Sequence, residues 1–196
     1  MMCLKRKLMA EFDVKEKEKR SNEDGFTLIE AMVVMIVGVM VLAGAAAGIN
    51  KLFVANNVST EAQNIQSIAA NMKTVASSEG GYDSITGNKE AIDLHVFPTN
   101  MKINGTDVRN VWGGSVVVAG TADSYTLTYP SVPAEECIQI ASKLRNASWD
   151  SVATAPDTAS GSDATANAGI TPTTTLADIQ TACGTKGKVT FTFVGH

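Results

Sequence analysis

The chain has few of the residues that usually carry out chemistry. Its 196 residues include two histidines, three cysteines and 6% aromatic residues. Neither His95 nor His196 lies in a nucleophile or metal-binding motif, and the paired glycines at 80–81 and 113–114 lack the lysine and the spacing of a phosphate loop. The sequence therefore predicts no enzyme, no cofactor and no metal site.

An excess of positive charge is also missing. The chain has 16 Lys and Arg against 20 Asp and Glu, which gives a formal net charge of −4 at pH 7. Domains that bind nucleic acid usually present a basic face. We therefore expect no nucleic-acid partner.

One long segment lacks charge almost entirely. Residues 26–49 are 24 residues with a single ionisable side chain, Glu30. At about 1.5 Å per residue, such a helix is long enough to cross a hydrocarbon core. An ionisable group inside a membrane segment is costly and is therefore a candidate functional site.

The 25 residues before this segment are highly charged. They contain seven Lys or Arg and six Asp or Glu. Basic residues beside a span favour the cytoplasmic side, and acidic residues count little. We therefore expect residues 1–25 inside the cell and the residues after Ile49 outside.

A secretory signal peptide is the alternative interpretation. The small residues at 43–47 resemble an A-x-A cleavage site, and cleavage there would discard the apolar run. The apolar region would, however, be long for a signal peptide, and Glu30 would interrupt it.

The string Gly25-Phe26-Thr27-Leu28-Ile29-Glu30 closely resembles the processing motif of type IV prepilins. The resemblance implies that a prepilin peptidase cuts between Gly25 and Phe26 and methylates the new amine of Phe26. The long leader and the cysteine pair in the C-terminal half are similar to type IVb major pilins, such as bundle-forming and toxin-coregulated pilins. Phe26 as the first mature residue is more typical of type IVa, whereas an apolar helix without proline favours type IVb.

The resemblance also gives Glu30 a role. Cleavage creates a positive amine about one helical turn from this carboxylate, and an unpaired charge of either sign is expensive in an apolar setting. The family resemblance implies that Glu30 of one subunit pairs with the amine of Phe26 in its neighbour and sets the axial register. The alternative is that Glu30 only reaches the membrane interface from the helix end.

The apolar helix is expected to continue as an amphipathic helix. Apolar residues follow steps of three and four up to Ala76, and Ser77 to Gly81 supply a stop. We predict a cleaved leader (1–25), a transmembrane and filament-core helix (26–49), an amphipathic helix packed on the head (50–79) and a globular domain (80–196). The stripe comprises Val54, Val58, Ala62, Ile65, Ile68, Ala69, Met72, Val75 and Ala76.

The fold class expected for the head is α+β with a small antiparallel sheet. Residues 82–112 look rich in loops, and residues 147–175 look like an exposed, irregular excursion anchored by Trp149. The elements predicted between and after them are strands at 114–119 and 124–129, helices at 133–145 and 176–183, and a strand at 188–194 within the sheet.

Two cysteines remain after the leader, which contains Cys3, is removed. Cys137 and Cys183 form an even pair in an exported domain, where oxidation is expected. A bridge closing roughly 45 residues would stabilise the head by about 4 kcal/mol. Metal binding by this pair is disfavoured, because neither has a Cys or His at close spacing.

We interpret the chain as the major subunit of a type IVb-like pilus. The resemblance implies as partners other copies of the chain, prepilin peptidase, the assembly platform with its ATPase, the secretin and, before assembly, the inner membrane. The final location is an extracellular pilus serving adhesion, aggregation or conjugative contact. The alternatives are a minor pilin, a secretion pseudopilin or a membrane-anchored binding module that does not polymerise.

Overall fold

The computed structural model describes residues 27–157 and 160–196. The chain divides into two compact units, Met1–Asn50 and Lys51–His196, and the long helix α2 (Leu28–Glu79) belongs in part to each. The expected leader, with Cys3 and Gly25, and the expected first mature residue, Phe26, lie outside the described residues.

In the first unit, α2 is an apolar helix with its side chains exposed. Leu28 is 81% exposed and Leu42 is 71% exposed. By length and composition, α2 is the one described helix that could span a membrane. The uninterrupted apolar composition, without proline, favours this helix, although the described residues of the first unit give it no packing partner.

In the second unit, α2 is amphipathic. Val58, Ile65 and Met72 are fully buried and recur at seven-residue steps, which places them on one face of the helix. The helix ends at Glu79, and the next residue is Gly80, whose φ of +83° favours glycine. The predicted stripe and stop are therefore confirmed.

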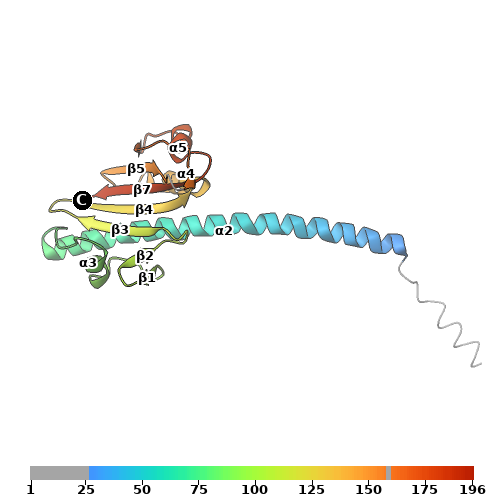
Figure 1. Cartoon of the computed structure of the whole chain (residues 1–196), viewed down its shortest axis with the longest axis horizontal. Coiled ribbons are helices and arrows are strands. Elements are labelled where there is room, and N and C mark those ends of the chain that lie inside the picture. The colour runs from blue at the N-terminus through green and yellow to red at the C-terminus, as the bar shows by residue number, and fades with distance from the viewer. Residues whose placement is uncertain (1–26, 158–159) are drawn as a thin grey trace, which may run out of the picture. The chain divides into compact units, whose positions relative to one another are not determined.

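The head contains a seven-stranded sheet in the order β1-β2-β3-β4-β7-β5-β6, and every pair of neighbouring strands is antiparallel. Figure 1 shows β3, β4, β7 and β5 side by side. The strands are β1 (Lys102–Asn104), β2 (Asp107–Arg109), β3 (Ser115–Gly120), β4 (Tyr125–Pro133), β5 (Ser151–Pro156), β6 (Ala168–Ile170) and β7 (Lys188–Gly195).

One face of this sheet forms the core. Inward-pointing residues alternate with outward-pointing ones along β4 and β7, so that Tyr129 and Phe191 are fully buried. Helix α4 (Ala134–Leu144) contributes its buried face to the same core. Helix α5 (Leu176–Cys183) lies on this face too, because buried Thr154 of β5 donates its hydroxyl to the carbonyl of Ala182. The sheet therefore has its helices on one side.

The predicted fold class and the predicted strands and helices at 114–145 and 176–194 are confirmed, with ends that shift by no more than four residues. The loop-rich interpretation of residues 82–112 was incomplete, since this segment also forms α3 (Asn88–Asp93), β1 and β2. The side chain of Asn88 fixes α3 to the sheet. It donates to the carbonyl of Val116 (2.7 Å) and accepts from the N–H of Val118 (3.0 Å).

The irregular excursion predicted at 147–175 was wrong at residues 151–156 and 168–170, which form strands β5 and β6. Strand β5 pairs with β7 over six residues, and β6 pairs with β5. The Ser, Ala and Thr residues of these strands give little hydrophobic signal, but Val152, Thr154 and Ile170 are buried where they face the core. Burial and pairing therefore decide the strand, whereas local propensity does not.

Candidate functional site

Glu30 lies in the first turn of α2. The hydroxyl of Thr27 accepts a hydrogen bond from the N–H of Glu30 (3.3 Å), and the carbonyl of Thr27 accepts one from Ala31 (3.1 Å). Thr27 is thus the residue that caps the helix, with Glu30 three positions later. Thr-Leu-Ile-Glu matches the Thr-x-x-Glu capping box, a pattern by which the sequence could have revealed this cap.

Glu30 lies among apolar side chains that are exposed. It is the one charged residue of the segment 28–49, and no hydrogen bond or ion pair to its carboxylate is recorded within the described part of the chain. Its neighbours Ile29 and Val33 are 74% and 55% exposed. A negative charge is favourable at a helix N-terminus, but this field gives only about 0.3–1 kcal/mol. The helix itself therefore stabilises the carboxylate only weakly.

The glycines of this segment also lack neighbours. A Cβ added at Gly38, Gly44 or Gly48 would meet nothing within 4 Å in the single chain. Their cost to helix stability, about 1 kcal/mol each, is consequently not offset by packing within the described chain. Small residues of this kind allow helices to approach closely in an apolar environment.

The cysteine pair is the second predicted feature, and the structure brings it together. Cys137 of α4 and Cys183, the last residue of α5, form a disulfide with a Cα–Cα distance of 5.8 Å. Both cysteines are fully buried. The bridge joins two helices on the core face and encloses β5 and β6 in its loop.

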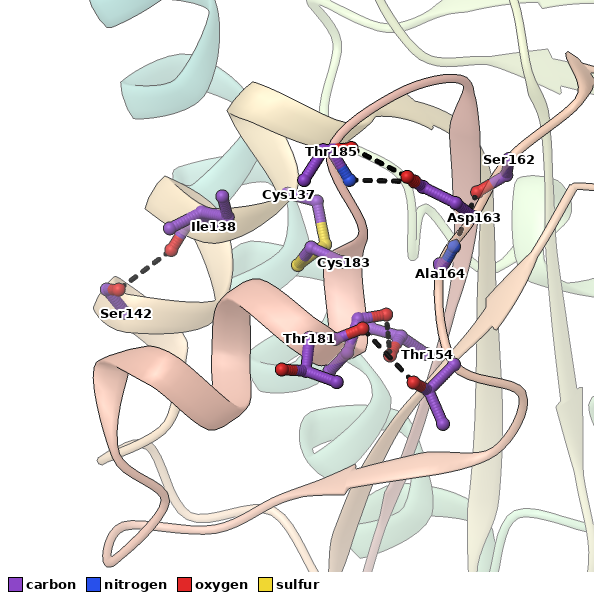
Figure 2. The surroundings of a disulfide bond; sticks show 12 residues. Cys137, Ile138, Ser142, Thr154, Ser162, Asp163, Ala164, Thr181, Cys183 and Thr185 are labelled. Carbon is purple, nitrogen blue, oxygen red and sulfur yellow. Dashed lines mark hydrogen bonds between the residues drawn. A yellow bond between two sulfur atoms is a disulfide. The ribbon is translucent and has the colours of Figure 1, made fainter.

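The carboxylate of Asp163 accepts hydrogen bonds from the turn that follows the disulfide. Figure 2 shows Asp163 facing Thr185, whose hydroxyl (2.6 Å) and N–H (2.7 Å) both donate to it. The N–H of Lys186 donates as well, at 3.0 Å. The hydroxyl of Thr185 and then these two N–H groups lower the pKa of Asp163 to about 2. Glycine suits position 184 for two reasons. Its φ is +72°, and a Cβ there would lie only 2.4 Å from the Asp163 carboxylate.

A buried polar network was missed by sequence reasoning. Glu61 of α2 is 4% exposed, and its carboxylate accepts from the hydroxyl of Tyr129, the N–H of Val111 (3.1 Å) and the amide of Asn64 (3.4 Å). Burial first, and then the charge of Glu61, raise the pKa of Tyr129 above its ordinary value of 10.0, so this phenol remains a donor. No cation is recorded as a partner of Glu61 among residues 27–157 and 160–196. The network connects α2 with β4 and with the turn before β3.

Two remaining candidate residues, Trp149 and His196, contact other residues of the head. Trp149 packs its ring 4.8 Å from that of Phe193, as expected for an anchor on the head. The described residues contain no group of three or more His, Cys, Asp or Glu that could hold a metal ion. His196 contacts Asp150 through Nδ1 at 2.5 Å.

Comparisons with known proteins give the family. Residues 55–195 match the family described as PilS N terminal, and residues 20–46 match the prokaryotic N-terminal methylation motif. No curated protein matches the chain.

Two solved structures are similar to it. The type IV b pilin of Salmonella typhi has 22% identity and a TM-score of 0.49 over 69% of this chain and 97% of that one. TcpA, a type IV pilin from Vibrio cholerae El Tor biotype, has 14% identity and a TM-score of 0.48 over 72% and 99%.

The PilS match covers more than half of the chain, and the methylation motif covers the segment that contains Glu30. The chain therefore belongs to the PilS family and is a type IV pilin, a structural subunit of a pilus and not an enzyme.

Proposed function

We propose that the chain is made as a membrane-anchored prepilin and assembled into a fibre through its N-terminal helix. Prepilin peptidase cuts between Gly25 and Phe26 and methylates the amine of Phe26. The leader is cytoplasmic and the head periplasmic before assembly. The assembly platform, its ATPase and an outer-membrane secretin then deliver the fibre to the cell surface, where it serves adhesion, aggregation or conjugative contact.

The observation that carries this proposal is the exposed apolar surface of α2. Between Leu28 and Ile49 the described side chains are exposed and, Glu30 apart, uncharged. Such a surface is unstable in water and needs lipid or other copies around it. Residues 26–49 accordingly serve first as the membrane span and then as the core of the filament, while residues 50–79 pack on the head domain (80–196).

Glu30 supplies the specificity of the assembly. Among other apolar helices, its carboxylate pairs with the amine of Phe26 in a neighbouring subunit, which fixes the register of one helix against the next. Removing one member of a buried charge pair costs about 3–5 kcal/mol, because the other charge stays buried without a partner. That cost corresponds to subunit association weaker by about a hundredfold to several-thousandfold.

Glu30→Gln tests the pairing separately from the cap. Glutamine at this position preserves a capping box but removes the charge. We expect the variant to be processed and to enter the membrane, and to yield almost no filaments by electron microscopy of sheared surface material. Glu79→Gln, at the exposed other end of α2, is the matched control and should yield filaments at the parental level.

Two results would contradict the proposal. Parental filament yield from Glu30→Gln would rule out charge pairing as the basis of register. Mass spectrometry of the mature chain should find N-methylated phenylalanine at position 26, and a terminus near Ala46 would show signal-peptide cleavage instead.

A further inference from the structure

A cavity lies at the β6 edge of the sheet, beside the loop between α4 and β5. It has a volume of about 160 Å³ and is lined by residues 145, 147, 149–152 and 169–172. Val152 and Ile170 form buried apolar parts of this lining. Ser151, Gly169 and Thr171 are exposed, so the cavity opens to the surface. Because a cavity of about 150 Å³ holds one benzene molecule, this one has room for a single six-membered ring.

Arg145 is the one cationic residue in the lining of this cavity. It caps the C-terminus of α4, and its Nη1 donates to the carbonyl of Thr174 at 2.9 Å, which holds the guanidinium in place. No ion pair of Arg145 is recorded among residues 27–157 and 160–196. Asp150, the one carboxylate in the lining, contacts His196 instead. The positive charge of Arg145 therefore has no carboxylate partner within the described residues.

Two buried N–H groups of lining residues also lack a partner. Nε of Arg145 and Nε1 of Trp149 are buried and form no hydrogen bond within the part of the chain that the structure describes. A buried donor without an acceptor is costly, and most buried donors in proteins have one. An acceptor that enters the cavity and draws either group toward it would remove this cost. The cavity therefore favours a ligand with an acceptor-only, negative group such as a carboxylate.

The rest of the lining indicates what the carboxylate is attached to. Trp149 and Pro172 contribute ring surfaces, which suit the apolar faces of a second ring. The carboxylate of Asp150 would repel a ligand that is only negative, but it can accept from hydroxyl groups. A sugar acid combines a six-membered ring, hydroxyl groups and one carboxylate. We propose that this cavity binds a hexuronate, with the carboxylate of the sugar on Arg145 and its ring against Trp149.

The two tryptophans of the chain provide the measurement. Nε1 is buried and unpartnered in both, but only Trp149 lines the cavity, so Trp112 is a matched reporter elsewhere in the head. Methyl α-galacturonide is titrated into the isotope-labelled, detergent-solubilised full chain, and the two indole N–H signals are followed by NMR. We expect the Trp149 signal to shift with a Kd of about 1 mM, as suits a small ligand in an open cavity, and the Trp112 signal to stay. Methyl α-galactoside has the same ring without the carboxylate and should bind at least about tenfold more weakly.

A pair of substitutions in the last turn of α4 tests the role of Arg145. The alternative is that Arg145 serves only the helix, because a cation is favourable at any helix C-terminus. Arg145→Gln should weaken binding of methyl α-galacturonide by at least about tenfold. Lys143→Gln makes the same change of charge two residues earlier, at an exposed side chain that does not line the cavity. This control should bind the sugar acid like the parent.

Several results would overturn the inference. A Trp149 signal that does not move at concentrations well above the expected Kd would exclude the site. Equal binding of methyl α-galactoside would exclude a role for the carboxylate, and this comparison on the parent stands even if Arg145→Gln does not fold. Equal binding of sodium acetate would exclude recognition of the sugar ring. Equal weakening by Lys143→Gln would show that overall charge and not the cavity governs binding. The measurement uses the single chain, so its result is independent of whether the chain assembles into filaments.

Discussion

Removing the hydroxyl of Tyr129 from the core should lower the stability of the head by more than the small size of this group suggests. Tyr129 is fully buried, and its hydroxyl donates to the carboxylate of Glu61, which is 4% exposed. In Tyr129→Phe the ring packing is retained, but the carboxylate keeps only the N–H of Val111 and the longer contact from Asn64 at 3.4 Å. A charged acceptor in the interior thereby loses its most buried donor.

The expected loss of stability follows from the kind of bond. A hydrogen bond to a charged group contributes about 1.5–3 kcal/mol, and a buried acceptor left without its donor costs a similar amount. We expect Tyr129→Phe to lower the free energy of unfolding of the head by about 2–3 kcal/mol. For a unit of about 150 residues this corresponds to a fall in Tm of about 4–12 °C. Fluorescence of Trp112 and Trp149, both in the head, reports unfolding of the detergent-solubilised chain in urea or on heating.

Tyr125 provides a matched control, because it lies four residues before Tyr129 on the same buried side of β4. It is 1% exposed, and its hydroxyl has no hydrogen-bond partner in the part of the chain that the structure describes. Tyr125→Phe removes a hydroxyl that makes no bond, so stability should stay the same or rise. Equal destabilisation by both substitutions would refute the reasoning, because burial of the ring and not the bond to Glu61 would then dominate.

Two further predictions concern the disulfide and the turn after it. Replacing both Cys137 and Cys183 by alanine opens a loop with a sequence separation of 46 and should cost about 4 kcal/mol in urea unfolding, while Cys3→Ala should change nothing. Dithiothreitol should lower the parent to the level of the double variant, and a parent insensitive to reduction would contradict this. Hydrogen bonds lower the folded-state pKa of Asp163 from 3.8 to about 2, so its contribution is present above pH 3.8 and disappears as the pH falls through 2. Asp163→Asn should therefore unfold more easily than the parent at neutral pH, and the difference measured by urea midpoints should vanish in acid. A difference independent of pH would contradict the assignment.

The features that could be predicted from the sequence are those that recur with a period or have a specific chemistry. Steps of three and four residues predicted the buried stripe of α2, since a helix brings Val58, Ile65 and Met72 to one face whatever packs on it. Alternation predicted β4 and β7 for the same reason. An even pair of cysteines in an exported domain predicted the bridge between Cys137 and Cys183.

The features that could not be predicted depend on partners distant in the sequence. Glu61 looks like any solvated glutamate on a helix, because its donors Val111 and Tyr129 lie 50 and 68 residues away. Strand β5 looks like a polar loop because Ala and Thr have little hydrophobic signal, and it becomes a strand by pairing with β7.

The carboxylates of α2 at positions 30 and 61 differ in the partners that the described residues give them. Glu61 is buried and has its three donors within its own compact unit, so its charge is already compensated in the single chain. Glu30 is exposed among apolar side chains, and the described residues offer its carboxylate no hydrogen bond or ion pair. Surrounding those apolar side chains with lipid or with other copies would bury Glu30 as well, and a buried charge requires a partner. Under the proposed assembly, this partner is the amine that cleavage would create at Phe26, which would be positive and would recur in each copy.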